Sequence, residues 1–212
     1  RKVRKMLVIF EFEAEMYRRH GVDAVFVGHP LLDRPAKPDR ALRIELRIGD
    51  APLIGLLPGS RSSQFRRLMP RMAEAAKLIR KEMPGARFVV GCAPKIDPKL
   101  AERPGLDVVW NRTAEVMSSS DLLITASGTA TIEAAVHGTP MIVTYVLNPL
   151  MVMAARKIIQ LRQYAMVNIV AGREIMPEMY QEKADPELLA RETVAIFREG
   201  RLPKMRQELE DV

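Results

Sequence analysis

Short, largely apolar runs recur along the chain, and each ends in glycine, proline or polar residues. Runs without an alternating polar face are typical of parallel strands that are covered on both sides. Longer stretches with helical spacing of apolar residues separate them. We predict strands at 53–57, 87–91, 107–110, 121–125 and 141–146. We predict helices at 65–82, 114–118, 131–137 and, from the helix-start pair Asp185-Pro186, to about Arg198.

This alternation of strands and helices predicts an α/β fold, namely a Rossmann-like, doubly wound parallel sheet. Residues 1–33 contain a further strand–helix–strand unit that begins with the apolar run 6–10. The polar, proline-containing stretch 34–50 is expected to be a linker. The sheet domain is then expected to occupy 51–200, followed by a charged C-terminal helix at 201–212.

Residues 134–155 contain no Asp, Glu, Lys or Arg over roughly the length that spans a bilayer. Gly138, Pro140 and Asn148-Pro149 interrupt this stretch, so a spanning helix would lose backbone hydrogen bonds. We expect a buried strand followed by a surface helix instead. That helix leaves two alternatives open: packing on the sheet, which we favour, or contact with anionic lipid through an apolar face with basic flanks. The residues concerned are Met151, Met153, Arg156, Lys157 and Arg162.

The composition indicates a globular chain that can bury a core, since 48% of its 212 residues are apolar and 28% are charged. This excludes a disordered tail or a collagen-like fibre. With one cysteine and three histidines, a Cys/His zinc site is close to excluded. The net charge of +7 favours anionic partners. Nucleic acid is the least favoured of these, because only 5% of residues are aromatic and no RNA-binding or helix-turn-helix signature is present.

A first candidate site is the sequence LLPGSRSSQ at 56–64, a strand that ends in a glycine turn and opens a helix. Gly59 permits the tight turn, Ser60 and the following N–H groups can point outward, and the helix start favours anions. Arg61 adds a guanidinium suited to phosphate oxygens. The sequence is neither a Walker loop nor a dinucleotide fingerprint. Taken alone, an ordinary turn with a surface arginine is an equally good interpretation.

A second candidate site follows the strand predicted at 121–125. Ser127, Gly128 and Thr129 come at its carboxyl end, where open α/β sheets bind ligands. Thr129, Ala130 and Thr131 are expected to open the next helix, and Glu133 lies about one turn inside it, within reach of a sugar hydroxyl. A solvated glutamate is the alternative. Two phosphate-suited loops at strand ends of one sheet favour a nucleotide diphosphate.

A third segment, 167–182, places Asn168 and Gln181 in apolar sequence and breaks the chain at Gly172. Buried amides usually satisfy backbone groups, so the pattern alone assigns no function here.

Six motifs occur together in the order and spacing of one family: VGHPLLD (27–33), LLPGSR (56–61), SDLLITASGTATIEAA (120–135), GTPMIVTY (138–145), NP (148–149) and VNIVAGRE (167–174). The chain closely resembles the lipid-A-disaccharide synthase family, glycosyltransferases of the GT-B architecture. The resemblance implies transfer of 2,3-diacylglucosamine from UDP-2,3-diacylglucosamine to 2,3-diacylglucosamine 1-phosphate, with release of UDP. It also implies an enzyme that works without a metal or other cofactor, peripherally at the cytoplasmic face of the inner membrane.

The resemblance also implies roles for individual residues. Gly59, Ser60 and Arg61 would face the UDP diphosphate, with Arg61 stabilising the charge on departing UDP. The 127–130 loop, with Ser127, Gly128, Thr129 and Ala130, would hold phosphate. The ribose hydroxyls would donate to Glu133. Residues that would line the donor cleft are Asn168, Gly172 and Gln181.

Two departures from the family pattern affect the expected activity. Glu11 stands where the family usually has proline, which changes the entry to Glu13. The family also carries an acceptor-binding domain ahead of residue 6, with the catalytic carboxylate base, and no residue here matches that base. We therefore expect the donor-binding part of the enzyme plus a remnant, able to bind UDP and inactive in transfer. The alternatives are another UDP-N-acetylglucosamine enzyme of this architecture (a 2-epimerase or the peptidoglycan-precursor transferase) or a non-catalytic UDP-sugar-binding module.

Overall fold

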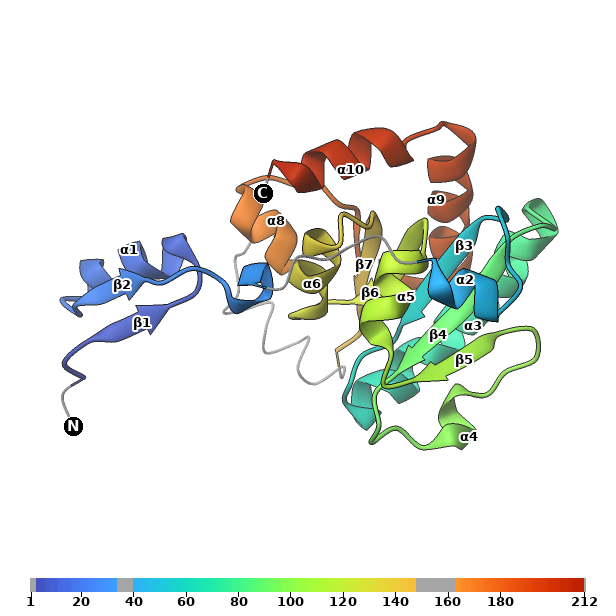
Figure 1. Cartoon of the computed structure of the whole chain (residues 1–212), viewed down its shortest axis with the longest axis horizontal. Helices are drawn as coiled ribbons and strands as arrows, with labels where there is room; N and C mark the ends of the chain where they lie inside the picture. Colours follow the sequence, from blue (N-terminus) through green and yellow to red (C-terminus); the bar gives the residue numbers. More distant parts are fainter. Residues whose placement is uncertain (1–2, 34–39, 148–162, 212) are drawn as a thin grey trace. The chain divides into compact units, whose positions relative to one another are not determined.

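A computed structural model describes residues 3–33, 40–147 and 163–211 of the chain. The chain divides into two compact units, Arg1–Ala36 and Lys37–Val212 (Figure 1). The division falls inside the stretch expected to be a linker.

The smaller unit is a strand–helix–strand motif, as predicted. The strands β1 (Met6–Val8) and β2 (Ala24–Phe26) pair in parallel, and α1 (Glu11–Arg19) connects them. A short 3-10 turn, η1 (Pro30–Asp33), follows. Val8, Ala14 and Ala24 form the small core of this unit.

The larger unit is built on one six-stranded sheet in which every neighbouring pair is parallel. In chain order the strands are β3 (Leu53–Leu57), β4 (Arg87–Cys92), β5 (Asp107–Trp110), β6 (Leu122–Ala126), β7 (Met141–Tyr145) and β8 (Glu178–Tyr180). Across the sheet their order is β5-β4-β3-β6-β7-β8. Counted from β3, this is 3-2-1-4-5-6, the strand order of dinucleotide-binding Rossmann folds. The predicted fold class is confirmed.

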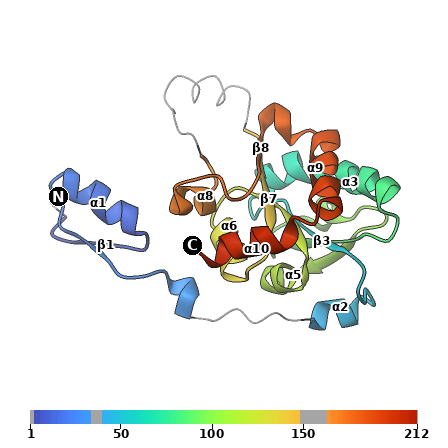
Figure 2. The same cartoon turned by 90° about the horizontal axis from the view of Figure 1, so that it is seen from above.

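Helices cover both faces of this sheet, which explains its uninterrupted apolar strands. All five residues of β3 and of β6 are buried. On one face α3 and α9 pack together, and on the other α5 packs beside α6 (Figure 2). The helices of this unit are α2 (Ala41–Glu45), α3 (Ser62–Glu82), α4 (Pro98–Ala101), α5 (Thr113–Ser119), α6 (Ala130–Val136), α8 (Met166–Ala171), α9 (Pro186–Arg198), α10 (Leu202–Glu210) and the 3-10 turn η2 (Gln181–Ala184).

The predicted elements that fall on described residues are present, with shifted ends. The helix predicted from 65 begins at Ser62. The start predicted at Asp185-Pro186 is confirmed, because the Asp185 carboxylate accepts from the N–H groups of Glu187 and Leu188. Four helices and strands, α2, α4, α8 and β8, were not predicted, because each is short.

The sheet domain extends beyond the limits of 51–200 that were predicted from the sequence. Part of the expected linker forms α2, whose Arg43 is buried against the sheet domain. The C-terminal helix α10 contributes Met205 and Leu209 to the same core as the sheet. Residues 40–50 and 201–211 therefore belong with the sheet.

The proposed basic, apolar surface helix (Met151, Met153, Arg156, Lys157 and Arg162) lies outside the described residues. In the part of the chain that the structure describes, no helix is long and apolar enough to cross a membrane.

Candidate nucleotide-sugar site

The site is positioned by the two central strands of the sheet, β3 and β6. They are neighbours, with Leu57 paired in register with Thr125, although two other strands separate them in the sequence. From β3 the chain turns to one face of the sheet, and from β6 it turns to the other. This is the topological switch point, where open α/β sheets have a crevice for ligands. The two predicted loops follow the carboxyl ends of these two strands.

The first loop requires glycine at residue 59. Gly59 has φ +107°, a conformation that side chains rarely adopt. A Cβ there would clash with Oε1 of Gln64. Ser60 and Arg61 are exposed, and Arg61 is the extended residue that precedes α3. The side chain of Arg61, at the N-cap, makes no capping hydrogen bond to this 21-residue helix, so the helix start presents N–H groups and a positive dipole end.

The second loop is fixed by hydrogen bonds from its own residues. The N–H of Ser127 donates to the carbonyl oxygen of Thr144 at 3.0 Å. Gly128 has φ +148° with open space around it, and its carbonyl oxygen accepts from Oγ1 of Thr131 at 2.8 Å. Thr129 is exposed, Ala130 is the first residue of α6, and Glu133 is half-buried one turn further on. The loop is thus ordered while its hydroxyl at Thr129 stays accessible.

Asn168 is fully buried in α8, and its amide makes four hydrogen bonds within the chain. Its Nδ2 donates to the Met176 carbonyl oxygen and to Oε1 of Glu178, both at 2.8 Å. Its Oδ1 accepts from the N–H groups of Ile175 and Met176 at 2.9 and 3.0 Å. These bonds use the full capacity of the amide. The side chain therefore holds the 175–178 backbone, and its contact with a donor stays a prediction.

The other two residues of the third segment are backbone positions. Gly172 ends α8 in the left-handed conformation, with φ +67°, as helix-ending glycines commonly do. Gln181 follows β8 with φ +55° and begins η2. Their predicted contact with a donor is likewise untested.

Three residues beside the second loop were not predicted from the sequence: Tyr164, Glu178 and Tyr180. The Glu178 carboxylate accepts from the N–H groups of Tyr164 at 3.0 Å and Ala165 at 2.9 Å. The carbonyl oxygen of Tyr164 accepts from Oγ of Ser127 at 3.2 Å. The only available signal was a glutamate in an otherwise apolar segment, because these contacts join segments far apart in sequence.

Burial sets the electrostatics of two ionisable groups here. It raises the pKa of the Tyr180 phenol, and the nearby Glu178 charge raises it further. Burial lowers the pKa of His137, at the end of α6, against the opposing effect of Glu133. Both side chains are therefore uncharged at neutral pH.

No group of three His, Cys, Asp or Glu side chains suited to a metal ion occurs among the described residues. The two segments that follow the carboxyl ends of β3 and β6 carry loop N–H groups, hydroxyls, one guanidinium and one carboxylate. Such a set suits a diphosphate with an adjoining sugar hydroxyl.

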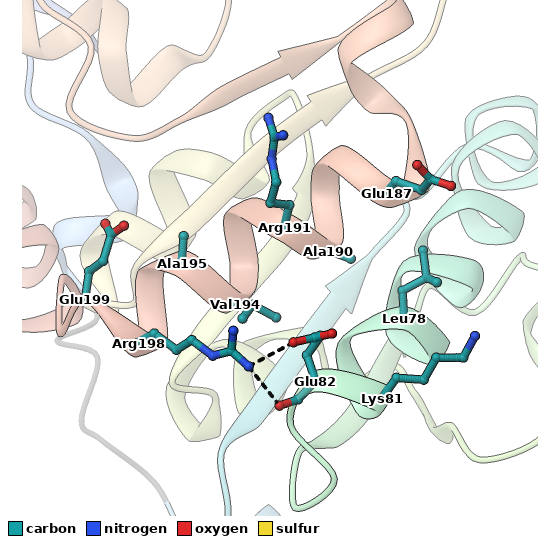
Figure 3. A pocket seen from close by; sticks show the side chains of 10 residues that line it. All are labelled: Leu78, Lys81, Glu82, Glu187, Ala190, Arg191, Val194, Ala195, Arg198 and Glu199. Atoms are coloured by element: carbon teal, nitrogen blue, oxygen red, sulfur yellow. Dashed lines mark hydrogen bonds and ion pairs between the residues drawn. The ribbon is translucent and has the colours of Figure 1, made fainter.

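A separate groove of about 500 Å³ lies between α3 and α9 (Figure 3). Leu78 and Val194 line it, and at one end Nη2 of Arg198 pairs with Oε2 of Glu82 at 2.9 Å. Glu187 and Arg191 lie along the same groove. The groove contains none of the predicted site residues, so Glu187 and Arg191 can serve as control positions for substitutions in the site.

Comparison with known proteins gives one family. The family model for lipid-A-disaccharide synthetase matches residues 1–211. A lipid-A-disaccharide synthase from Anaeromyxobacter dehalogenans is 40% identical over 98% of this chain and 58% of its own length. The chain thus spans somewhat over half of that relative.

Solved structures share the fold at low sequence identity. A putative UDP-N-acetylglucosamine 2-epimerase from Listeria monocytogenes superposes with TM-score 0.67 at 17% identity, over 94% of this chain and 52% of that one. The S. aureus MnaA–UDP complex also has TM-score 0.67, at 13% identity, over 97% of this chain and 54% of that one.

Proposed function

The chain belongs to the lipid-A-disaccharide synthetase family, and we propose that it provides the UDP-sugar donor site of that enzyme. The observation that carries the proposal is the meeting of the 59–61 and 127–130 loops at the switch point of a 3-2-1-4-5-6 sheet. Each loop precedes a helix, and together they offer donors from two directions to one diphosphate.

In this proposal the first loop binds the diphosphate and supports departure of UDP. The N–H groups that open α3 approach phosphate oxygens closely because Gly59 and Ser60 leave room. The exposed Arg61 neutralises the negative charge that grows on UDP as the glycosidic bond breaks. Because the guanidinium has no hydrogen bond to another described side chain, it is available to do so.

The second loop binds the other side of the diphosphate and the ribose. Thr129 presents its hydroxyl, and Ser127, Gly128 and Ala130 set the path of the backbone. Glu133 accepts from the ribose hydroxyls, which a carboxylate does better than a neutral side chain. Gly172 and Gln181 form the adjoining wall, and the buried Asn168 supports it by holding the 175–178 backbone.

The reaction proposed for the complete enzyme joins 2,3-diacylglucosamine from its UDP derivative to 2,3-diacylglucosamine 1-phosphate. It needs a base at the acceptor hydroxyl, and we assign none within these residues. We assign β1, α1 and β2 to the acceptor-binding domain. On its own, this chain is expected to bind UDP and to form no disaccharide. Association with the cytoplasmic face of the inner membrane is part of the same proposal, supported by the nature of the lipid substrates.

Calorimetric titration of UDP into the chain tests the donor site. Arg61→Ala and Glu133→Ala are each expected to weaken binding roughly tenfold, about 1.4 kcal/mol, through loss of a charge-assisted hydrogen bond. Matched controls are Arg191→Ala and Glu187→Ala in the α3–α9 groove, which are expected to bind like the parent. A folded parent chain that does not bind UDP contradicts the proposal, and so does equal weakening in all four variants.

The 2-epimerase alternative now depends on fold likeness alone, since the family model and the relatives of about 40% identity agree on the synthase. Adding a separately expressed acceptor domain and analysing the product distinguishes the two: disaccharide supports the synthase, and a 2-epimerised sugar supports the alternative. Restored transfer would also separate a split enzyme from a non-catalytic binding module.

A further inference from the structure

Tyr164 is an exposed aromatic residue beside the proposed phosphate loop. In the described part of the larger unit, only two large apolar side chains are strongly exposed: Ile44, at 77%, and Tyr164, at 45%. Ile44 belongs to α2. Tyr164 lies against Ser127, whose hydroxyl donates to its carbonyl oxygen at 3.2 Å. The exposed Tyr164 ring therefore lies at the edge of the sheet where we propose that the ligand binds.

The position of Tyr164 is also fixed from three sides. Its N–H donates to Oε2 of Glu178 at 3.0 Å, and its carbonyl oxygen accepts from Ser127. Its ring meets that of Tyr180 at 73°, with the ring centres 5.2 Å apart. Tyr180 is itself held in β8, in register with Tyr145. An exposed ring that is already ordered binds a ligand at a reduced entropic cost.

We propose that the ring of Tyr164 packs against the hexosamine ring of the nucleotide sugar, an inference that rests on the proposed donor site. If the Ser127 loop binds the diphosphate, a sugar bonded to that diphosphate lies within reach of Tyr164. The ribose is assigned to Glu133, on α6, so the sugar at the other end of the diphosphate, the hexosamine, lies beside Tyr164. The C–H groups on one face of a pyranose pack favourably on an aromatic ring, and a tyrosine adds no negative charge next to the phosphates.

The test compares two ligands, UDP and UDP-N-acetylglucosamine, by calorimetric titration. Tyr164→Ala is expected to weaken binding of UDP-N-acetylglucosamine about three- to tenfold and to leave UDP binding unchanged, which corresponds to the usual worth of an aromatic contact. Tyr164→Phe keeps the ring and is expected to bind both ligands like the parent. Ile44→Ala removes an exposed apolar side chain elsewhere in the unit and is the matched control.

Each other outcome has a definite meaning. Equal weakening for both ligands would show that Tyr164 acts on the phosphate loop through the backbone, and unchanged binding of both would exclude the contact; either result overturns the inference while the donor site stands. A folded parent chain that binds neither ligand overturns the donor site and the inference with it. Tyr164→Leu, checked by thermal melting, repeats the test with a smaller change in packing.

Discussion

Arg43 and Asp121 form an ion pair that joins α2 to the start of β6, with 2.6 Å between Nη2 and Oδ2. The Arg43 side chain is 9% exposed and that of Asp121 is 30% exposed. The same guanidinium donates to the carbonyl oxygens of Ser119, Gly49 and Ala51. A residue expected in a linker is therefore one of the best-connected in the sheet domain.

Removal of this arginine is expected to destabilise the chain. Arg43→Ala removes the short ion pair of the partly buried Asp121 carboxylate, which keeps only the more distant Arg206 guanidinium at 4.0 Å, and removes the Arg43 hydrogen bonds to three carbonyl groups. We therefore expect a loss of about 3 kcal/mol in the free energy of unfolding. Urea denaturation followed by circular dichroism measures it. Arg40→Ala is the control, because its pair with Asp50 is 3.5 Å long and highly exposed, and we expect a change within about 0.5 kcal/mol. Equal effects would mean that the Arg43 contacts contribute little.

Gly59→Ala is expected to destabilise the first loop by about 1–3 kcal/mol, because residue 59 has a φ that alanine adopts only with strain. The new Cβ would also displace the Gln64 side chain. Gly85→Ala is the matched control, since residue 85 has neither a positive φ nor any atom within 4 Å of the new Cβ. Thermal melting of both variants is the measurement. If the Gly59→Ala chain is as stable as the Gly85→Ala chain, alanine at residue 59 is not strained and the prediction is wrong.

Asn168→Ala separates a structural role from a ligand contact. It leaves the N–H groups of Ile175 and Met176 without their acceptor, and we expect a loss of about 2–4 kcal/mol in unfolding free energy. At a temperature where the variant stays folded, its affinity for UDP is expected to fall less than that of Arg61→Ala. Unchanged stability together with a large loss of UDP affinity would instead establish Asn168 as a ligand contact.

The single cysteine predicts a pH effect on stability. Burial raises the pKa of the Cys92 thiol to about 11, whereas a cysteine thiol in the unfolded chain has a pKa of about 8.5. Between these values the unfolded chain has lost the proton that the native chain keeps, so the free energy of unfolding falls as pH rises. Denaturation at pH 7.5 and 10 is expected to show a smaller fall for Cys92→Ala than for the parent. An identical pH dependence would place the thiol in a wetter environment.

How much was predictable depended on the range of the interactions. The strands from 53 to 146 and the helix at Asp185-Pro186 followed from apolar runs and a local cap, which are properties of a few adjacent residues. The short elements α8 and β8 did not, because Asn168 and Glu178 stabilise them through contacts that propensity does not encode. The helix α2 was mistaken for a linker for the same reason, because Arg43 holds it in place through a carboxylate far along the chain.

The sequence by itself determined which glycines turn the chain, which strands are buried on both faces, and the family motifs. Only the tertiary structure decided that β3 and β6 are neighbours, and therefore that the Gly59 and Ser127 loops follow adjacent strand ends at one edge of the sheet. It also decided that Asn168 faces inward while Tyr164 stays exposed beside Ser127. The physical reason is that backbone conformation and burial pattern are set within a few residues, whereas strand order and polar partnerships are set by packing across the whole core.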